Sequence, residues 1–478
     1  MKKHFILIIS LCCQFLFGVF LFDKKLSTGG DNVCYIALCE SIISGKGYKE
    51  IYKPDEPAAK HFPPGFPFLL TIPHLLFGRN IMAFKIWVFL MGMVSTILFY
   101  LILQMIWKKG VNFLLPLFAI NPLFLKYHSV ILSEVPFIFS SLLFVYLFLK
   151  WEKEGRFLYL IFSVFASIFA YYVRSVGIAY FPAILLYLLI RKKYREFLVA
   201  FLIIFVLILP WLIRNRYAGG GESYFAQFLW KNPYAPELGR ITFLDLLKRI
   251  WHNLKMYSGF LMSKILLIGK INTFASLIIT GLMIAGFIFT LLKLRKVNIL
   301  HLILIFYMGV VLIWPEVWTG ARFILPVFPF VLYFVSKSVE KIKFGLHILT
   351  AIFSIFALIA IFQYSEQVRR PYPPDWISYF DVAKWCKKYT ERDAKIMCRK
   401  PEFMWFFSDR KAFGYPMTSD HIKMWQAIKK ADYIVIDAFR WTMTTYKYLI
   451  PAIKDSIEKF KVMYVSPHPK TYLVKYSP

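Results

Sequence analysis

Ionisable residues stand at or near the ends of long apolar segments of this chain, where a charge is costly to bury. The set contains acids, bases and cations: Asp31, Lys60, His61, His128, Glu134, Arg174, Arg214, Glu316 and Arg322. Residues of this kind at membrane depth are candidates for function, because burial there is expensive. A carboxylate can serve as a general base, and lysine or arginine can bind a phosphate.

Asp31 follows the first apolar segment, within the stretch "STGGDNVCYIALCESIISGKGY". It precedes a short helical pattern, so helix N-capping is one interpretation of this residue. The other interpretation is a carboxylate held at the membrane surface for catalysis, and the two can coexist. Tyr35 lies one helical turn further along the same face.

The remaining candidates sit in short motifs between apolar segments. Arg322 begins a segment in "ARFILPVFPF", where the helix dipole and the positive-inside bias both disfavour a cation. Arg174 lies in a tight turn, and Lys60 and His61 precede two prolines in "KHFPPGFPFLL". A phosphate is a natural partner for the two arginines, and snorkelling to lipid phosphates is the alternative. Lys60 and His61 either lead from a loop into a helix, or Lys60 reaches an anionic head group. Glu134, in "SEVPF", either caps a helix or takes part in chemistry.

The apolar segments themselves indicate a polytopic α-helical membrane protein. The chain has 478 residues, of which 59% are hydrophobic and 19% aromatic. About eleven segments are long and apolar enough to cross a membrane. Their ranges are 4–22, 81–107, 111–127, 135–151, 157–173, 177–190, 197–213, 264–292, 298–314, 322–336 and 346–363. We expect the first to be a retained helix rather than a cleaved signal peptide.

The net charge of +31 does not indicate a nucleic-acid partner, because the basic residues recur between apolar segments. They cluster at 107–110, 150–156, 191–196, 293–296 and 337–343. With the N-terminus in the cytoplasm, all of these loops fall on the cytoplasmic side, as the positive-inside rule requires. We therefore expect a multi-pass protein of the cell membrane, with the candidate site on the extracytoplasmic face.

Two domains are expected. Residues 1–364 form the transmembrane part, with external loops at 23–80 and 214–263, and residues 365–478 form a small extracytoplasmic α/β domain. The first loop should contain helices at about 32–44 and 66–77, and the second an interfacial helix within 241–262. The tail should contain a helix at 375–390, strands at 394–399 and 432–437, and two closing strands.

The cysteines leave two interpretations open. Cys34 with Cys39, or Cys386 with Cys398, could form a disulfide on the external side, or all of them are free thiols. Their spacing indicates neither a zinc site nor a redox dithiol.

Several stretches taken in order resemble bacterial family-39-type glycosyltransferases. These stretches are "GGDNVCYIALCESIISGKGY", "KHFPPGFPFLL", "SEVPF" and "ARFILPVFPF". The family includes relatives of protein O-mannosyltransferases and of the lipid A aminoarabinose transferase, in the GT-C class. The resemblance runs from the first span to about residue 330.

The resemblance implies a membrane enzyme that transfers a sugar from a polyprenyl-phosphate donor to an external acceptor. Asp31 matches the family's acidic residue in the first external loop and would be the general base. Lys60, Arg174 and Arg322 match basic positions that would bind the donor phosphate. Further candidates for contacts with donor or acceptor are Tyr35, His61, His128 and Glu134.

The chemistry of such a transfer agrees with these residue types. One base and a basic cluster suffice for a single displacement with inversion, whereas a retaining double displacement would need a second carboxylate. The acceptor is a lipid, a glycan or a protein, and membrane lipids surround the enzyme. No metal-ligating residues are assigned, no cofactor is certain, and a divalent metal ion stays open.

Two other classes remain as alternatives. A transporter or flippase of lipid-linked glycans would share the spans and the basic residues, but it should carry charges deep in the membrane. A non-catalytic scaffold that displays the tail domain would tolerate replacement of Asp31 and Arg322. The position of the ionisable groups at helix ends favours the enzyme.

Overall fold

The computed structural model describes residues 4–218, 227–235, 238–266, 272–294, 297–454 and 456–477. The chain divides into two compact units. The helical unit consists of Met1–Ser27, Lys60–Ala218 and Glu222–Arg369, and the tail unit contains Thr28–Ala59 and Arg370–Pro478. This division groups 28–59 with the tail. The assignment of 1–364 to a transmembrane domain and of 365–478 to an extracytoplasmic domain stays a prediction.

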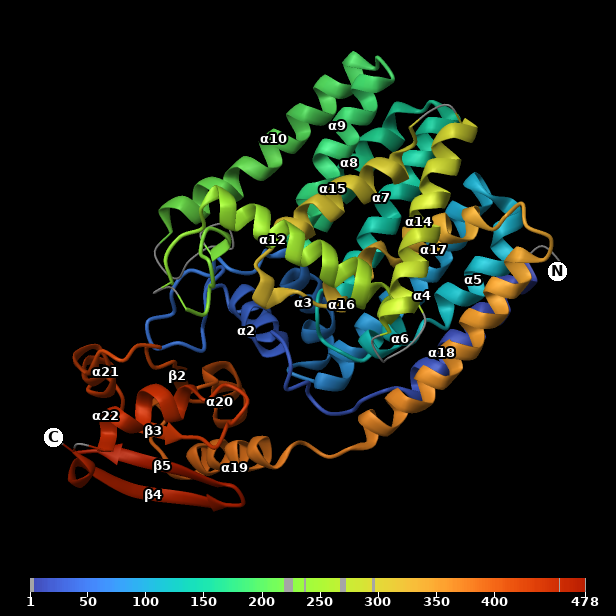
Figure 1. Cartoon of the computed structure of the whole chain (residues 1–478). Coiled ribbons are helices and arrows are strands. Elements are labelled where there is room, and N and C mark those ends of the chain that lie inside the picture. Colours follow the sequence, from blue (N-terminus) through green and yellow to red (C-terminus); the bar gives the residue numbers. More distant parts are fainter. Residues whose placement is uncertain are drawn as a thin grey trace. The chain divides into compact units, whose positions relative to one another are not determined.

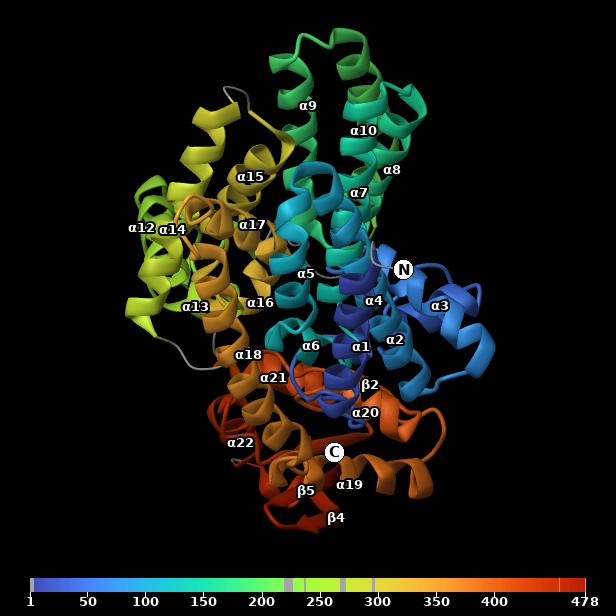
Figure 2. The same ribbon diagram turned by 90° about the vertical axis from the view of Figure 1, so that its right-hand side faces the viewer.

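The helical unit is built from α-helices (Figure 1). Its helices are α1 (Phe5–Phe20), α3 (Gly65–Phe77), α4 (Ile81–Ile106), α5 (Val111–Ala119), α6 (Pro122–His128), α7 (Glu134–Glu154), α8 (Phe157–Val173), α9 (Tyr180–Ile190), α10 (Tyr194–Tyr217), α12 (Phe243–Met256), α13 (Met262–Leu266), α14 (Thr273–Leu294), α15 (Ile299–Ile313), α16 (Ala321–Ile324), α17 (Phe328–Ser338) and α18 (Gly345–Arg369). Figure 2 shows α18 running beside α5 and α6.

The described helices are apolar and long enough for a multi-pass membrane protein. Six of those described could cross a membrane by length and composition, or seven if the pair at Lys108–Ala119 and Pro122–His128, bent by 53°, is one span. The other expected spans correspond to shorter apolar helices, so the count of about eleven stays a prediction. Large apolar side chains are exposed along α10, including Leu198, Phe205 and Val206. A surface of this kind suits contact with lipid rather than water.

One predicted boundary is wrong. The span expected at 264–292 begins only at Thr273, and residues 262–266 belong to the separate short helix α13. Asn272 precedes the span and its side-chain oxygen accepts a hydrogen bond from the amide of Ala275 at 2.9 Å. An asparagine in this position starts a helix, which an apolar pattern alone does not reveal.

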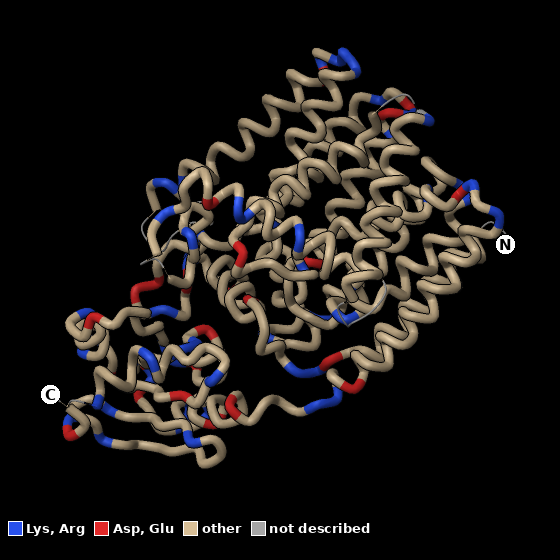
Figure 3. The backbone as a smooth tube through the Cα atoms, viewed as in Figure 1, with Lys and Arg blue, Asp and Glu red and all other residues tan. Residues whose placement is uncertain are grey.

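The basic loops gather at one end of the helical unit. Contacts join them in series: Arg191 Nη2 lies 3.6 Å from Glu152 Oε1, and Lys293 Nζ lies 3.8 Å from Glu340 Oε2. Arg191 also donates to the carbonyl of Val297 at 3.5 Å. In the long apolar helices α7, α10 and α18, the charged residues lie near the helix ends (Figure 3). A common end for these loops is what the positive-inside argument requires, although it does not say which side of the membrane they face.

Helix α12 exposes apolar side chains and buries polar ones. Phe243, Leu244 and Trp251 are exposed, whereas Arg249 and Asn253 are buried. This inversion fits a helix whose outer face contacts lipid. The helix expected within 241–262 is therefore present, and its place at the membrane interface stays a prediction.

The tail unit contains a five-stranded mixed sheet with helices packed around it (Figure 1). Its elements are α2 (Asn32–Ile43), α19 (Pro374–Tyr389), β1 (Lys395–Met397), α20 (Pro401–Ser408), β2 (Lys411–Phe413), α21 (His421–Ile428), β3 (Tyr433–Ile436), α22 (Ile450–Lys454), β4 (Phe460–Pro467) and β5 (Lys470–Tyr476). The strand order is β2-β1-β3-β5-β4, with β1 parallel to β2 and β3, and β5 antiparallel to β3 and β4.

The tail therefore has the α/β character that its sequence predicts. The helix at 375–390 and the strands near 394–399, 432–437 and the C-terminus are all present, whereas β2 was not foreseen. All six cysteines are free, so the structure contains neither of the two disulfides considered from the sequence. Burial raises the pKa of the Cys398 thiol, which makes it an unreactive core residue.

Candidate active site

Three charged residues that lie far apart in the sequence meet in the helical unit. Glu134 is the first residue of α7, Arg174 follows the last residue of α8, and Arg322 lies in α16. Glu134 Oε1 lies 2.7 Å from Arg174 Nη1 and 3.0 Å from Arg322 Nε. Because α7 runs on to the basic loop at 150–156, this cluster lies at the opposite helix ends, about 30 Å away along α7.

The cluster is buried and carries more positive than negative charge. The Glu134 side chain is 1% exposed, Arg174 is 11% exposed and Arg322 is 30% exposed. One carboxylate facing two guanidinium groups leaves a formal excess of one positive charge. A partly buried cation needs an anion, and a guanidinium binds phosphate with charge-assisted, often bidentate hydrogen bonds. The arrangement is thus suited to bind a phosphate.

Neighbouring groups fix the two arginines. Both guanidinium carbons lie 5.2 Å from the centre of the Phe323 ring. The hydroxyl of Ser133 accepts a hydrogen bond from Arg174 at 3.3 Å, and the Tyr307 hydroxyl donates to the Phe323 carbonyl at 2.6 Å. The guanidinium groups are therefore held by the protein before any ligand is present, which reduces the entropy lost on binding.

The loop before Arg322 is held by α12. The side-chain amide of Asn253 donates to the carbonyls of Leu312 and Trp314 at 2.8 and 2.7 Å, and its oxygen accepts from Thr319 at 2.8 Å. The exposed carbonyls at the end of α15 are thereby satisfied. The same contacts connect α12 to the segment that carries Arg322.

The "HFPPG" motif lies against the end of α8, next to Arg174. A Cβ atom on Gly65 would stand 2.5 Å from the carbonyl carbon of Tyr172, so only glycine permits this close approach. His61 and Lys60, which precede this contact, are both half-buried. The His61 ring packs edge-on against Phe62, with the ring centres 4.6 Å apart. Lys60 forms no hydrogen bond or ion pair with the described residues.

His128 lies in a different, fully buried network. Its Nδ1 lies 2.6 Å from the Phe124 carbonyl, and its Nε2 lies 2.9 Å from the side-chain amide of Gln14. Thr96 donates to the Gln14 side-chain oxygen at 2.7 Å. Both ring nitrogens thus have protein partners, which gives His128 a packing role in this arrangement.

Asp31 and Tyr35 belong to the tail unit. Asp31 occupies the N-cap position of α2, but its side chain accepts no capping hydrogen bond from the first turn. The capping alternative is therefore not what the structure shows. Gly30 has a φ angle of 101°, a conformation that favours glycine and sets the turn into Asp31. Tyr35 is buried, with 5% of its surface exposed.

The donor set for a metal ion is missing from the described residues. They contain no group of three or more His, Cys, Asp or Glu side chains that could hold one. Hard divalent cations need several oxygen ligands, and Glu134 instead faces two arginines.

Part of the chain is similar to a known family of membrane proteins. Residues 61–213 match the family model of dolichyl-phosphate-mannose-protein mannosyltransferases. A search of curated proteins finds no match. The matched range includes His61, His128, Glu134 and Arg174, but neither Asp31 nor Arg322.

Two solved structures share the fold. One is the oligosaccharyltransferase of Archaeoglobus fulgidus tethered to an acceptor peptide, with a TM-score of 0.58, 12% identity, and coverage of 98% of this chain and 74% of that one. The other is ArnT from Cupriavidus metallidurans bound to undecaprenyl phosphate, with a TM-score of 0.58, 12% identity, and coverage of 98% and 97%. The chain thus has the GT-C-like fold of membrane glycosyltransferases, and the resemblance inferred from its sequence is confirmed.

The sequence predicted the charged residues of the cluster but not the residues that hold them in place. It did not foresee Phe323, Ser133, Asn253 or the role of Gly65. The glycine after two prolines was a usable signal, because such a glycine often marks a close backbone approach. The aromatic ring and the amide resemble ordinary core residues in a sequence, so nothing in the pattern singled them out.

Proposed function

We propose that this protein transfers a sugar from a polyprenyl-phosphate donor to an acceptor by a single displacement. The observation that carries the proposal is the pair Arg174 and Arg322 around Glu134, a buried cluster with excess positive charge at the helix ends opposite the basic loops. The family match and the fold shared with ArnT bound to undecaprenyl phosphate support a lipid-phosphate donor.

In this mechanism the acceptor attacks the anomeric carbon while the bond to the donor phosphate breaks. The electron pair of that bond leaves with the polyprenyl phosphate, whose growing negative charge Arg174 and Arg322 stabilise. Asp31 accepts the proton that the acceptor loses, as a general base. With one base and no nucleophilic carboxylate, the anomeric configuration is inverted.

The other candidates take supporting roles. Glu134 is a positioning residue, since it holds both guanidinium groups and lowers their mutual repulsion. Lys60 is a further cation for the phosphate, and His61 and Tyr35 are candidates for contacts with the sugar or the acceptor. His128 is not given a role in substrate binding.

The site is proposed to face the extracytoplasmic side, with the N-terminus and the basic loops in the cytoplasm. A reporter that is active only in the cytoplasm should be silent when fused after Pro478. A bright signal would contradict this orientation.

The function is tested with the purified full-length protein. Mass spectrometry of the co-purifying lipid should find a polyprenyl phosphate or its sugar ester. That sugar ester, added back with membrane extract as acceptor source, should release free polyprenyl phosphate with wild-type protein and much less with Arg174→Ala. Movement of an intact sugar lipid across a vesicle membrane without this release would instead indicate a flippase.

A further inference from the structure

The tail unit holds the loop that carries Asp31 by its outermost strand. β2 is an edge strand of the sheet, and its Ala412 amide donates a hydrogen bond to the carbonyl of Tyr52 at 2.8 Å. The neighbouring Lys411 side chain donates to the carbonyl of Ile51 at 2.5 Å. The loop therefore covers a part of the sheet edge that would otherwise present unpaired backbone groups.

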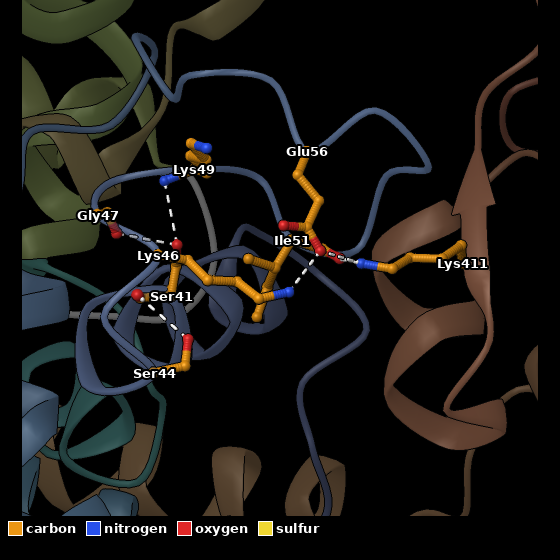
Figure 4. A network of polar contacts seen from close by, with 8 residues as sticks. All are labelled: Ser41, Ser44, Lys46, Gly47, Lys49, Ile51, Glu56 and Lys411. Carbon is orange, nitrogen blue, oxygen red and sulfur yellow. Dashed lines mark hydrogen bonds and ion pairs between the residues drawn. The ribbon is translucent and has the colours of Figure 1, made fainter. Parts of the chain in front are cut away.

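Glu56 is the centre of a charge network that fastens this loop (Figure 4). Its Oε1 accepts from Lys411 in β2 and lies 2.7 Å from Lys46 Nζ in the loop itself. The Glu56 backbone has a φ of 42°, a left-handed conformation that a non-glycine residue adopts only when its surroundings hold it there. Partial burial works to raise the pKa of Glu56, but the two lysines outweigh it and keep that pKa below its usual value.

The network continues from Glu56 to the helix that Asp31 precedes. The Ser41 hydroxyl, near the end of α2, donates to the Gly47 carbonyl at 2.9 Å and accepts from the Lys49 amide at 3.1 Å (Figure 4). Lys46 belongs to the same turn as Gly47 and Lys49. A continuous set of contacts thus links β2 through Glu56 and this turn to α2.

We propose that the tail domain acts as a clamp on the catalytic loop, and that Lys411 and Glu56 are positioning residues for Asp31. The catalytic consequence rests on the proposed function, whereas the clamp itself does not. Half-exposed ion pairs usually add little to stability, so an effect on overall stability is not expected. What the pair supplies is a fixed conformation of the loop.

The test uses full-length protein and the variants Lys411→Met and Lys411→Arg. The matched control is Lys387→Met, which removes an ion pair to Asp409 within residues 370–478 of the tail unit. Hydrogen exchange of peptides within 31–59 reports the clamp, and kcat and KM for the donor report its catalytic effect.

Lys411→Met should speed exchange in 46–59 and lower kcat about tenfold, the scale of a modest misplacement, with little change in KM or melting temperature. Lys411→Arg should keep hydrogen exchange and kcat close to the wild-type values, because the positive charge is retained. Lys387→Met should match the wild type in both. Unchanged exchange in Lys411→Met would refute the clamp, and faster exchange with wild-type kcat would refute the positioning role. An inactive wild type would refute the proposed function, while the exchange data would still decide on the clamp.

Discussion

Helix α7 carries a glutamate–arginine contact at each end, and the two contacts differ in kind. At its first residue, Glu134 is 1% exposed and faces Arg174 at 2.7 Å and Arg322 at 3.0 Å. Near its last residue, Glu152 is 37% exposed, lies 3.6 Å from Arg191 and accepts a hydrogen bond from Tyr187. The same residue types thus form a buried, cation-rich cluster at one end and a solvated pair at the other.

The difference separates two uses of positive charge in a membrane protein. The exposed pair belongs to a basic loop, where lysine and arginine set topology and each contact is screened by water. In the buried cluster, charges have lost their hydration, so the excess cation gains strongly from an anionic ligand. The number of arginines does not distinguish these ends, whereas burial and charge balance do.

The largest expected effect comes from Glu134→Gln. The substitution leaves two buried guanidinium groups without their shared carboxylate, and breaking a buried pair in this way costs about 3–5 kcal/mol. Glu152→Gln should cost less than about 1 kcal/mol, as exposed pairs do. Thermal unfolding of the full-length protein in detergent should show a decrease in melting temperature for Glu134→Gln that is several times the decrease for Glu152→Gln. Equal drops would mean that the two contacts do not differ energetically.

Arg322→Ala should have the second-largest effect. In the proposed site this substitution removes a charge-assisted contact to the donor phosphate. Such a contact typically contributes about 2–4 kcal/mol, so affinity for a polyprenyl-phosphate sugar should fall roughly 30- to 1,000-fold. Arg322→Lys should recover only part of this, because a bidentate fork is lost.

Arg191→Ala, at the exposed pair, serves as the control for Arg322→Ala and should bind the donor like wild type. Donor binding by intact Arg322→Ala protein at wild-type strength would remove Arg322 from the phosphate site.

Asp437 offers a third case beside Glu134 and Glu152, because it is a buried acid without an ion-pair partner among the described residues. Its carboxylate accepts hydrogen bonds from the Thr445 hydroxyl at 2.7 Å and the Phe439 amide at 3.0 Å. Burial nevertheless raises the pKa of Asp437 to about 6. From about pH 4 to 6 the folded state binds the proton more tightly than the unfolded chain, so this group's contribution to stability falls as pH rises.

The side chain of Asn cannot ionise, so the Asp437→Asn protein should not lose stability in this way as pH rises. Its stability relative to wild type should therefore improve by roughly 2–3 kcal/mol between pH 4 and pH 7. Hydrogen exchange of the β3 peptide, followed at both pH values in the full-length variant and the full-length wild type, measures this change in relative stability. A constant difference between the two proteins across this range would show that Asp437 titrates normally.

Much of the fold was predictable because it depends on local composition. Apolar segments of sufficient length predicted α4, α7, α10 and α18, and the short helices α2 and α3 were placed within a residue or two. Strand β2 was missed, because "KAF" is too short for an alternation pattern. The start of α14 was missed because it is set by the capping of Asn272 rather than by hydropathy.

The candidate site was predictable in its members but not in its connections. Glu134, Arg174 and Arg322 stood out because each is an ionisable residue at the end of an apolar segment. That one carboxylate contacts both arginines depends on how α7, α8 and α16 pack, which no local pattern encodes. The attachment of the loop of Asp31 to the tail domain is likewise a long-range contact, between Tyr52 and Ala412.

The most direct test of the central claim is sugar transfer by Asp31→Asn. Asn has nearly the same size and shape as Asp and is accepted equally well before a helix, so the substitution should keep the fold and the melting temperature close to those of the wild type. Asn cannot accept a proton, so the account predicts that transfer falls roughly 10²- to 10⁴-fold, the usual contribution of a general base. A stable Asp31→Asn protein that transfers sugar at the wild-type rate would contradict the account.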